Sequence, residues 1–587
     1  MMTIHNLPPA FIIIGGAILL MLLPKKARPY AYLIFPILAF ALLLNLQQGA
    51  NLTMPFLNYE LVLCRVDRLS MAFAYVFVIM CFLGGVYSFH VKDLLQQVAS
   101  LLYVGSSLGV VFAGDLVTLI IYWELMAVSS VCLVWARRTP EARKAGYRYI
   151  LVHIFGGSVL MAGILLHIQQ TGSIAFTHFG GSIASYLIMI SFCLNAAVPP
   201  LNGWLPDAYP EGTVTGSVFL SAFTTKVAVY ALARGFAGFE VLMWAGAIMA
   251  VYGVVFAFLS NDGRRLLAYH IISQVGYMVC GVGIGTAVAI NGATAHAFAH
   301  ILYKGLLFMG IGTVLYATGT ARLDRLGGLA GKMKWALILF MVGAFSISGV
   351  PLFSGFVSKS MVIFAAETGH LAAIVLLLNL ASVGTFLSIG LKLPYFTWFG
   401  KETDIKPQPV PVNMYIGMAL TSALCIAIGV YPSLLYNILP NTPVNYQPYS
   451  TTHLLETMQI LIFTFLGFWL VLRKIHMHAT ITLDTDWFYR KPSGFAYYVF
   501  SVSICNLFGW IERLSLRLVS AVVKASNNPP GYLVQMSRQL RSAFTGSEDP
   551  SPEPGTFSPD RYRIPLGFMV FVVLLIFIIL LLWYLFV

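Results

Sequence analysis

The stretch INGATAHAFAHILYKGLLFMGIGTVLYA, residues 290–317, decides the fold class of this chain. It is apolar over a length that can cross a bilayer as a helix, since about 20 residues suffice. Comparable runs recur almost from end to end of the 587 residues, of which 59% are hydrophobic and 10% charged. A soluble protein carries about a quarter charged residues. The sequence therefore predicts an all-α, polytopic membrane protein.

Sixteen membrane spans are predicted, if the long run at 335–366 counts as one interrupted crossing and not as two helices. They lie at 9–23, 30–46, 69–89, 98–113, 116–136, 147–168, 183–198, 212–233, 240–260, 266–286, 290–317, 335–366, 371–397, 413–431, 455–472 and 566–587. Basic residues collect in the loops of one side, whereas loops 169–182 and 432–454 contain no Lys or Arg. This asymmetry agrees with the positive-inside rule. It also accounts for the net charge of +13 without nucleic-acid binding.

Two segments share a pattern that interrupts an apolar run. VPPLNGW (198–204) and VPLFSGF (350–356) both read V-P-x-x-x-G-aromatic. Pro and Gly break a helix within a span, and paired breaks in two halves of a chain are a sign of transporter repeats. The pattern therefore favours an internal repeat, although chance similarity is the alternative.

The C-terminal part differs from the rest. After a polar segment at 482–492, apolar residues recur at helical spacing from Ile504 to Val522, with Arg513 and Arg517 off that stripe. An amphipathic helix along the inner membrane surface or on neighbouring helices is the expected structure. NNPP (527–530) ends it, a flexible acidic linker follows, and a last apolar helix spans the membrane.

Ionisable residues inside predicted spans are the candidate functional residues. They are Glu124, Lys226, the triplet His296, His300 and Lys304, and Lys359. A charge at the bilayer centre costs at least about 2.5–3.5 kcal/mol, so such residues are hypotheses of function by default. Burial in an apolar site lowers the pKa of a lysine, and a nearby carboxylate raises it again. Histidines titrate near neutral pH. Together they indicate a proton relay.

Structural alternatives exist for each of these residues. Glu124 and Lys226 could form a buried ion pair, the two histidines could be core residues, and Lys359 could reach to the membrane surface. A metal site at the histidines lacks a third ligand nearby in sequence. The seven cysteines show no CxxC pair and indicate no iron–sulfur or zinc site. Anchoring near span ends is expected of three further basic residues, Arg264, Arg265 and Lys392.

The chain resembles the antiporter-like membrane subunits of complex I, membrane-bound hydrogenases and multisubunit Na⁺/H⁺ antiporters. Four segments carry the resemblance in the family's order: WLPDAYPEGTVTGSVFLSAFTTKVAVYALAR (204–234), DGRRLLAYHIISQVGYM (262–278), HAFAHILYKGLLF (296–308) and GVPLFSGFVSK (349–359). Tyr209 and His270 make it most similar to the D-type antiporter subunit. Its tail resembles that of the distal complex I subunit.

The resemblance implies two inverted five-helix repeats with broken helices, among about 14 core transmembrane helices. It also implies roles: Glu124 as the carboxylate, Lys226 as its partner, His296, His300 and Lys304 as the central relay, and Lys359 as the exit-side lysine. Arg264 stands where relatives have a lysine, and an Arg does not release its proton. This departure moves the expected relay role to His270, with Asp207 in support.

The resemblance also implies a division of the chain. The segments are N-terminal transmembrane helices at 1–97, a first half at 98–260, a second half at 261–430, an additional helix at 431–480, the lateral helix region at 481–546, a linker at 547–563 and an anchor at 564–587.

The expected function is translocation of H⁺, alone or in exchange for Na⁺, by a subunit of a multisubunit complex in an energy-transducing, prokaryotic cytoplasmic membrane. Its partners would be other membrane subunits and the lipid bilayer, with no cofactor, metal or nucleic acid. One alternative is a proton-pumping subunit of a quinone or hydrogenase oxidoreductase with redox centres in other chains. Another is a proton-coupled partner of a zinc protein for inorganic-carbon uptake, and a third is an inactive scaffold.

Overall fold

The computed structural model describes residues 7–49, 51–471, 484–485, 487, 492, 494–495, 497–546 and 565–586. The chain forms two compact units, Met1–Trp487 and Phe488–Val587. The polar segment predicted at 482–492 is described only in part, and the linker predicted at 547–563 lies outside the described residues.

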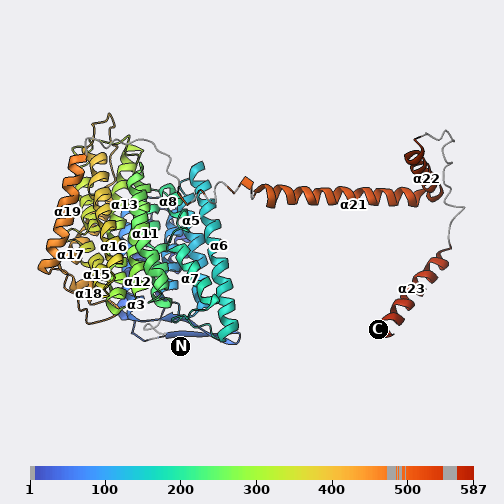
Figure 1. The fold of residues 1–587 in the computed structure, drawn as a ribbon, viewed down its shortest axis with the longest axis horizontal. Helices are drawn as coiled ribbons and strands as arrows, with labels where there is room; N and C mark the ends of the chain where they lie inside the picture. Colours follow the sequence, from blue (N-terminus) through green and yellow to red (C-terminus); the bar gives the residue numbers. More distant parts are fainter. Residues whose placement is uncertain are drawn as a thin grey trace. The chain divides into compact units, whose positions relative to one another are not determined.

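The first unit is a bundle of membrane-length helices (Figure 1). It begins with α1 (Pro9–Leu22), α2 (Arg28–Asn45), the strands β1 (Asn51–Phe56) and β2 (Tyr59–Arg65), and α3 (Arg68–Tyr87). The next group is α4 (Leu94–Phe112), α5 (Leu116–Trp135), α6 (Pro140–Thr171), α7 (Ile183–Asn195), α8 (Trp204–Ala208), the 3₁₀ turn η1 (Tyr209–Glu211), α9 (Gly216–Ala222) and α10 (Thr224–Gly235).

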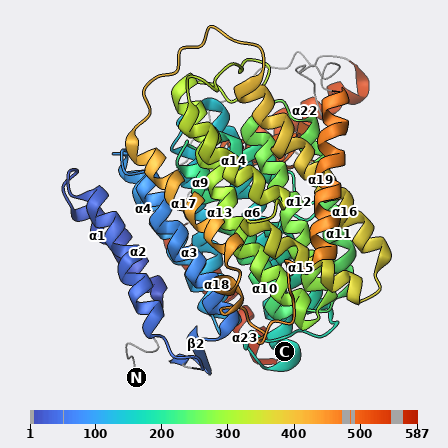
Figure 2. The same cartoon turned by 90° about the vertical axis from the view of Figure 1, so that its left-hand side faces the viewer.

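A second group of helices follows in the same unit. It comprises α11 (Glu240–Leu259), α12 (Gly263–Ile284), α13 (Ala287–Thr318), α14 (Lys334–Ser348), α15 (Ser354–Thr368), α16 (Ala372–Thr385) and the π-helical segments η2 (Phe386–Lys392) and η3 (Tyr395–Phe399). The unit then adds α17 (Val412–Val430), α18 (Ser433–Tyr436) and α19 (Thr451–Val471). Figure 2 shows α1 and α2 at the edge of the bundle, next to α3 and α4.

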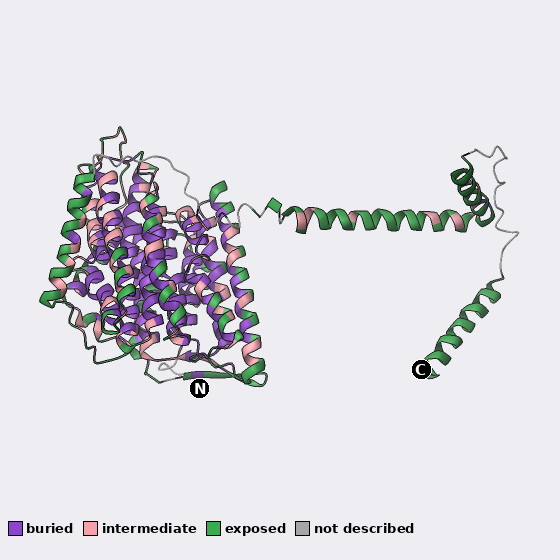
Figure 3. Ribbon diagram, viewed as in Figure 1, coloured by how far each residue is buried: buried purple, intermediate pink, exposed green. Residues whose placement is uncertain are grey.

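Fourteen helices among the described residues are long and apolar enough to cross a membrane, and thirteen of them coincide with predicted spans. The other, Tyr498–Asn527, is the segment predicted as amphipathic, and three shorter apolar helices, α1, α7 and α14, coincide with the remaining predicted spans. Helix is present in every one of the predicted spans. The predicted class, a helical multi-pass membrane protein, is therefore confirmed. Figure 3 shows the matching burial pattern, with buried residues inside the bundle and exposed ones on its outer helices.

One element was not expected from an all-α prediction. β1 and β2 form an antiparallel hairpin in which Leu52 pairs with Cys64 and Phe56 with Tyr59. The backbone N–H of Val62 donates to Asp115 Oδ2 at 2.7 Å. This bond fastens the hairpin to the start of α5.

Aspartates begin several of the helices. Asp67, Asp93, Asp115 and Asp262 are the N-caps of α3, α4, α5 and α12, and each accepts a backbone N–H of the first turn. A carboxylate satisfies free N–H groups there and interacts favourably with the helix dipole. These acidic residues therefore have a structural use and are separate from the ionisable groups inside the spans.

Residues 335–366 form one interrupted crossing. α14 packs on the C-terminal part of α13, where an added Cβ at Gly310 would lie 2.7 Å from Phe340, and α15 packs on its N-terminal part, where one at Gly292 would lie 3.0 Å from Val362. The two short helices thus follow α13 continuously in the opposite direction. The break at 349–353 contains two positive φ angles, 77° at Gly349 and 73° at Leu352.

The first VPxxxG segment lies at the equivalent place. α7 packs along α6, where an added Cβ at Gly163 would lie 2.8 Å from Ile188. Past the break at 196–203, the ring of Trp204 in α8 lies 5.4 Å from that of Tyr149 in α6. Both long partner helices, α6 and α13, have 32 residues. The two sequence segments therefore interrupt corresponding crossings of two similar halves.

The two halves are inverted relative to each other. Arg137, which precedes α6, and Arg264, at the start of α12, both donate to carbonyls of segment 209–213. The backbone of Asp262 forms an isolated antiparallel β-bridge with that of Arg322, which follows α13. α6 therefore begins at the face where α13 ends. We call this the basic face. The opposite face carries loop 432–450, whose Asn441 carbonyl accepts a hydrogen bond from the Asn291 side chain near the start of α13. We call this opposite face the neutral face.

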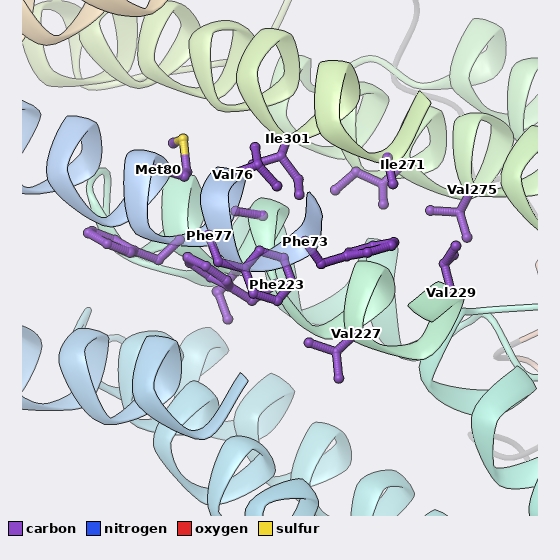
Figure 4. Packing of buried hydrophobic residues seen from close by; sticks show 14 of the residues in the cluster. Phe73, Val76, Phe77, Met80, Phe223, Val227, Val229, Ile271, Val275 and Ile301 are labelled. Atoms are coloured by element: carbon purple, nitrogen blue, oxygen red, sulfur yellow. The ribbon is translucent and has the colours of Figure 1, made fainter. Parts of the chain in front are cut away.

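Aromatic packing fixes the break between α9 and α10 at Phe223. Its ring lies 5.1 Å from that of Phe77 in α3 and 5.3 Å from that of Tyr103 in α4, both edge-on. Figure 4 shows Phe223 among Phe73 and Phe77, with Ile271 and Ile301 of the second half nearby. The interruption of the helix is therefore part of the hydrophobic core, and the Phe223 ring packs between α3 and α4.

The second unit contains the π-helical segment η5 (Tyr498–Ser503), α21 (Ile504–Asn527), α22 (Pro529–Thr545) and α23 (Leu566–Phe586). NNPP lies at the junction of α21 and α22, where the Asn528 side chain accepts the Gly531 N–H at 3.1 Å. No residue of α21 is buried within the chain. The apolar stripe from Ile504 to Val522 is therefore available to lipid or to a partner.

Ending the chain after Trp487 is expected to leave the first unit folded and to weaken its association with neighbouring membrane subunits. The first unit is compact by itself, and the cut keeps Asp484, which accepts hydrogen bonds from Tyr252 and Tyr269. Copurification of partner subunits and the thermal unfolding midpoint of the chain are the measurements. The pair Leu514→Ser and Leu518→Ser, on the stripe, should reproduce the partner loss. Undiminished copurification of the shortened chain would contradict the assembly role.

Candidate functional site

Lys226 lies just past the break between α9 and α10 and is fully buried. Its Nζ donates to the carbonyl of Ser221, on the other side of the break, at 2.5 Å. Interrupting the helix frees backbone carbonyls at the end of α9, and such carbonyls carry partial negative charge that favours a cation. The break therefore supplies the partner of the lysine.

Two further lysines also donate to backbone carbonyls at helix ends. Lys359 Nζ donates to the Ser348 carbonyl across the break between α14 and α15 at 3.5 Å, and to Ser382 Oγ at 2.8 Å. Lys392, at the end of η2, donates to the Ser260 carbonyl just past α11 at 2.9 Å. All three cations are thus held by carbonyls at helix ends.

The placement of Lys392 differs from the expectation of a span-end anchor. Its side chain is 1% exposed, and it lies inside the long candidate span Ala372–Phe399. Lys226 and Lys392 both lie in the helical segment that follows a VPxxxG crossing. The sequence pattern showed that Lys392 stands near the end of its span but not that folding packs this end against the end of α11.

His296, His300 and Lys304 lie on α13 and are completely buried. The ring centroids of the two histidines are 6.2 Å apart, which agrees with the predicted stripe. Neither ring nitrogen of His300, nor Nζ of Lys304, has a hydrogen-bond partner among the described residues. Buried polar groups normally have partners, so these groups call for bridging water.

His296 belongs to a hydrogen-bonded chain that crosses four helices. Its members, in order, are Ser358 of α15, His296 and Tyr303 of α13, Gln274 of α12 and Thr385 of α16. The donor–acceptor distances between successive members are 3.2, 3.4, 3.4 and 3.3 Å. Sequence reasoning missed Ser358, Tyr303, Gln274 and Thr385 because they do not ionise at neutral pH. Gln274 in the apolar run 266–286 was a usable signal.

His270 of α12 connects to the same region. It shares a hydrogen bond of 2.6 Å with Ser388 of η2. Seven lysines and histidines are buried here, each at most 4% exposed: Lys226, His270, His296, His300, Lys304, Lys359 and Lys392. The ring of Tyr277 lies 5.8 Å both from the His296 ring and from Lys359 Nζ. The structure therefore brings together six of the seven predicted relay residues and adds Lys392.

Glu124, the seventh, is less buried than the other six. It is half-buried on α5, and no ion pair between Glu124 and Lys226 occurs in the described part of the chain. Its Oε1 has no hydrogen-bond partner there and faces Gly157 of α6, where an added Cβ would lie only 1.7 Å away. The suggested buried ion pair is therefore not what balances Lys226.

Gly157→Ala is expected to leave stability nearly unchanged and to slow ion transport several-fold. The new methyl group collides with the flexible end of Glu124, which can turn away at little cost, but the carboxylate then leaves its site. The measurements are transport in sealed vesicles and the thermal midpoint. Gly156→Ala, whose Cβ meets the end of Leu194 at 3.2 Å, is the matched control. Equal transport by both variants would separate Glu124 from conduction.

The remaining predicted residues hold the framework. Asp207 and Arg148 form a bidentate ion pair of 2.6 and 2.9 Å between α8 and α6. Arg264 is 2% exposed and donates to the Gly212 carbonyl at 2.7 Å, while the Arg265 guanidinium lies 6.0 Å from the Tyr269 ring centre. Arg264 therefore supports the segment before α9 from inside the protein.

One buried histidine was overlooked. His153 of α6 is 2% exposed, and its Nδ1 shares a hydrogen bond of 3.0 Å with Asn195. It stands inside the predicted span 147–168, so the criterion that found Lys226 could have found it. It lies beside the first VPxxxG break, as His296 lies beside α15.

The sequence matches a known family. Residues 113–388 match the family described as NADH:quinone oxidoreductase/Mrp antiporter, TM. The chain is 30% identical over 374 residues to an uncharacterized protein of Methanocaldococcus jannaschii, MJ1309, covering 59% of this chain and 77% of that protein. The chain belongs to this family. It is also 29% identical over 350 residues to the D-type subunit of the Na(+)/H(+) antiporter of Alkalihalophilus pseudofirmus, covering 55% and 69% of the two chains.

Solved structures share the fold. A chain of the membrane-bound sulfane sulfur reductase, an archaeal respiratory membrane complex, aligns with a TM-score of 0.68 at 22% identity, over 92% of this chain and all but 1% of its own. A chain of respiratory complex I from Thermus thermophilus aligns with a TM-score of 0.64 at 22% identity, over 74% of this chain and 100% of its own. The antiporter-like subunit is therefore an integral membrane protein of the Mrp and complex I family.

Proposed function

We propose that this antiporter-like subunit translocates protons across the membrane, alone or in exchange for Na⁺, through its buried lysines and histidines. The observation that carries the proposal is the burial of seven lysines and histidines, each at most 4% exposed, inside the membrane-spanning bundle: Lys226, His270, His296, His300, Lys304, Lys359 and Lys392. Four or more charges at bilayer depth cost on the order of 10 kcal/mol. A purely structural use does not explain groups without hydrogen-bond partners.

The carbonyl partners suit a lysine that gives up its proton. A carboxylate would hold the ammonium strongly, whereas the carbonyls of Ser221 and Ser348 stabilise it modestly and still accept a hydrogen bond from the neutral amine. Proton transfer across the 6.2 Å between histidine rings requires a bridging water. The unpartnered nitrogens of His300 provide sites for such water.

The proposed path joins the two inverted halves at α13. It runs from Lys226 in the first half, through the α13 triplet and His270, to Lys359 and Lys392 in the second half. Glu124 would act from the edge of the first half, and the exit-side role proposed for Lys359 is shared with Lys392.

The partners proposed are other membrane subunits of a multisubunit complex. The second unit, with its exposed apolar stripe, supports this, and the similar chains come from complexes. The relative named as part of a Na(+)/H(+) antiporter supports exchange with Na⁺.

The test is proton movement into sealed vesicles that contain the chain with its copurifying partners, followed with a pH-sensitive dye with and without Na⁺. Proton movement that requires Lys226 and changes with Na⁺ supports exchange, and movement independent of Na⁺ supports conduction of H⁺ alone. Vesicles with all partners present and no proton movement under an imposed Na⁺ gradient or redox drive would contradict the proposal.

A second candidate is a proton-pumping subunit of a redox-driven complex. The specific observation is structural coverage: the respiratory reductase chain aligns over 92% of this chain, whereas a chain of the Mrp complex from Dietzia sp. aligns over 77% of it. Copurifying flavin or iron–sulfur subunits would favour this candidate, and their absence from an active complex would exclude it.

A further inference from the structure

One buried histidine, His153 of α6, has no place in the path proposed above. Its ring lies 4.2 Å from that of Tyr149 and 4.7 Å from that of Trp204. Its Nδ1 shares a hydrogen bond with Asn195 Oδ1, whereas its Nε2 has no hydrogen-bond partner in the described part of the chain. A phenylalanine would fill the same space without leaving a buried polar atom unpaired, so packing does not account for the imidazole.

Asn195 fixes the hydrogen of this imidazole. It is the last residue of α7, just before the first VPxxxG segment, and it is completely buried. An amide oxygen only accepts a hydrogen bond, so Nδ1 carries the hydrogen of the neutral ring and Nε2 presents its lone pair. Nε2 is therefore the atom at which His153 can take up a proton.

The carboxyl group of Glu124 lies one helical turn away from His153 along α6. An added Cβ at Gly157 would lie 1.7 Å from Glu124 Oε1, so this oxygen takes the place of a side chain at position 157. Position 157 is four residues after His153, and side chains with this spacing on a helix have Cβ atoms about 5–6 Å apart. Glu124 Oε1, like Nε2, has no hydrogen-bond partner among the described residues. Bridging water can therefore join the two groups.

Helix α7 adds two more unpartnered polar atoms at this level. Ser191 and Asn195 are four residues apart, so they share one face of α7, and both are completely buried. Neither Ser191 Oγ nor Asn195 Nδ2 has a hydrogen-bond partner in the part of the chain that the structure describes. The ring of Trp123, next to Glu124, lies 5.1 Å from that of Phe192, next to Ser191. Unpartnered atoms of α5, α6 and α7 thus occur within about two helical turns, as expected of a site that holds ordered water.

Glu124 is the acid near His153 that has no charged partner. The acidic residues of α5, α7, α8 and η1, the elements packed against α6, are Glu124, Asp207 and Glu211, and these elements contain no basic residue. Arg148 and Arg137 bind Asp207 and Glu211, whereas Glu124 takes part in no ion pair among the described residues. The other ionisable groups of these elements are Tyr122, Cys132, Tyr186, Cys193 and Tyr209.

We propose that Glu124 and His153 form a proton-exchange pair in the first half, joined by water and oriented by Asn195. In this step the O–H bond of the Glu124 carboxyl group breaks, and its electron pair stays on the oxygen. The bridging water accepts this proton and gives one of its own to His153 Nε2, so the products are a carboxylate and an imidazolium. The return step reverses both transfers. The role of the pair in transport rests on the proposed function, whereas the pairing itself does not.

The first measurement is proton uptake by vesicles that contain the full chain with its partners. Glu124→Gln and His153→Gln are each expected to slow uptake about tenfold or more, and the double variant should be no slower than the slower single one, because each change removes the same exchange. His153→Gln should also alter the pH profile, since an amide does not titrate. His167→Gln, the same exchange further along α6, is the matched control and should behave as wild type.

The second measurement is the infrared spectrum of the Glu124 carboxyl group, whose bands are assigned as those lost in Glu124→Gln. These bands should shift in His153→Gln and not in His167→Gln, because only the first change removes the hydrogen-bonded partner of the carboxyl group. If His153→Gln does not accumulate, Asn195→Leu replaces it. That variant removes the acceptor that holds the hydrogen on Nδ1, so it should shift the same bands and slow uptake.

Glu124 bands, uptake rates and pH profiles that are the same in His153→Gln and His167→Gln would overturn the pair, and so would fully additive losses in the double variant. Shifted bands in a complex that has all its partners and moves no protons would leave the pair in place and overturn the proposed function instead. The two failures are therefore distinguishable.

Discussion

Lys226→Ala is expected to abolish proton translocation, by about a hundredfold or more, while protein level and assembly stay near normal. Loss of a positioned proton-transfer group costs about 10²–10⁴ in rate. Removing the buried cation relieves about 2.5–3.5 kcal/mol, whereas the Ser221 carbonyl loses its hydrogen-bond partner at a cost of about 1–3 kcal/mol. These terms nearly offset, so the fold survives.

The assay compares proton uptake by vesicles at matched protein content. Lys226→Arg should fail as well, because a guanidinium keeps the charge but does not release its proton. Lys334→Ala, the same exchange at an exposed lysine, should transport like the wild type. Wild-type transport by Lys226→Ala at normal level would remove the first lysine from the path.

His300→Gln is expected to slow transport about tenfold or more and to flatten its pH dependence, with little change in stability. Glutamine fills most of the volume of the imidazole but does not titrate. His300 is completely buried, and its two ring nitrogens have no hydrogen-bond partner in the described part of the chain, so the exchange breaks no protein–protein bond. His300→Ala should be slowed at least as much.

The comparison variant is His178→Gln, the same exchange at an exposed loop histidine, which should behave as wild type. The rate and pH profile of proton uptake and the thermal midpoint are measured together. Unaltered rate and pH profile in His300→Gln would show that the histidine is structural, and the central relay would have to be reassigned to the chain of Gln274, Tyr303 and His296.

The helical spans were predictable because hydropathy over about 20 residues is a local property of the sequence. The paired VPxxxG segments likewise predicted both interruptions, since Pro and Gly act on their own backbone. The hairpin at 51–65 was missed because its strands are short and pair in a loop between two predicted spans.

The candidate site was predictable only in its composition. The criterion of an ionisable residue within an apolar run predicted five residues that the structure shows to be buried: Lys226, His296, His300, Lys304 and Lys359. The hydrogen-bonded chain through Gln274 and Tyr303 was not expected, because its hydrogen bonds join side chains on different helices, and the sequence does not show which helices are neighbours.

The sequence by itself determined that this protein spans the membrane repeatedly, that its halves repeat, and which charges it places in the bilayer. Each of these follows from residue type and spacing along one helix. Only the tertiary structure decided the partners of those charges: Lys226 binds the Ser221 carbonyl in place of Glu124, and Lys392 is buried at the end of α11. The reason is that a freed carbonyl at a helix break or end becomes a partner only when folding brings a cation to it.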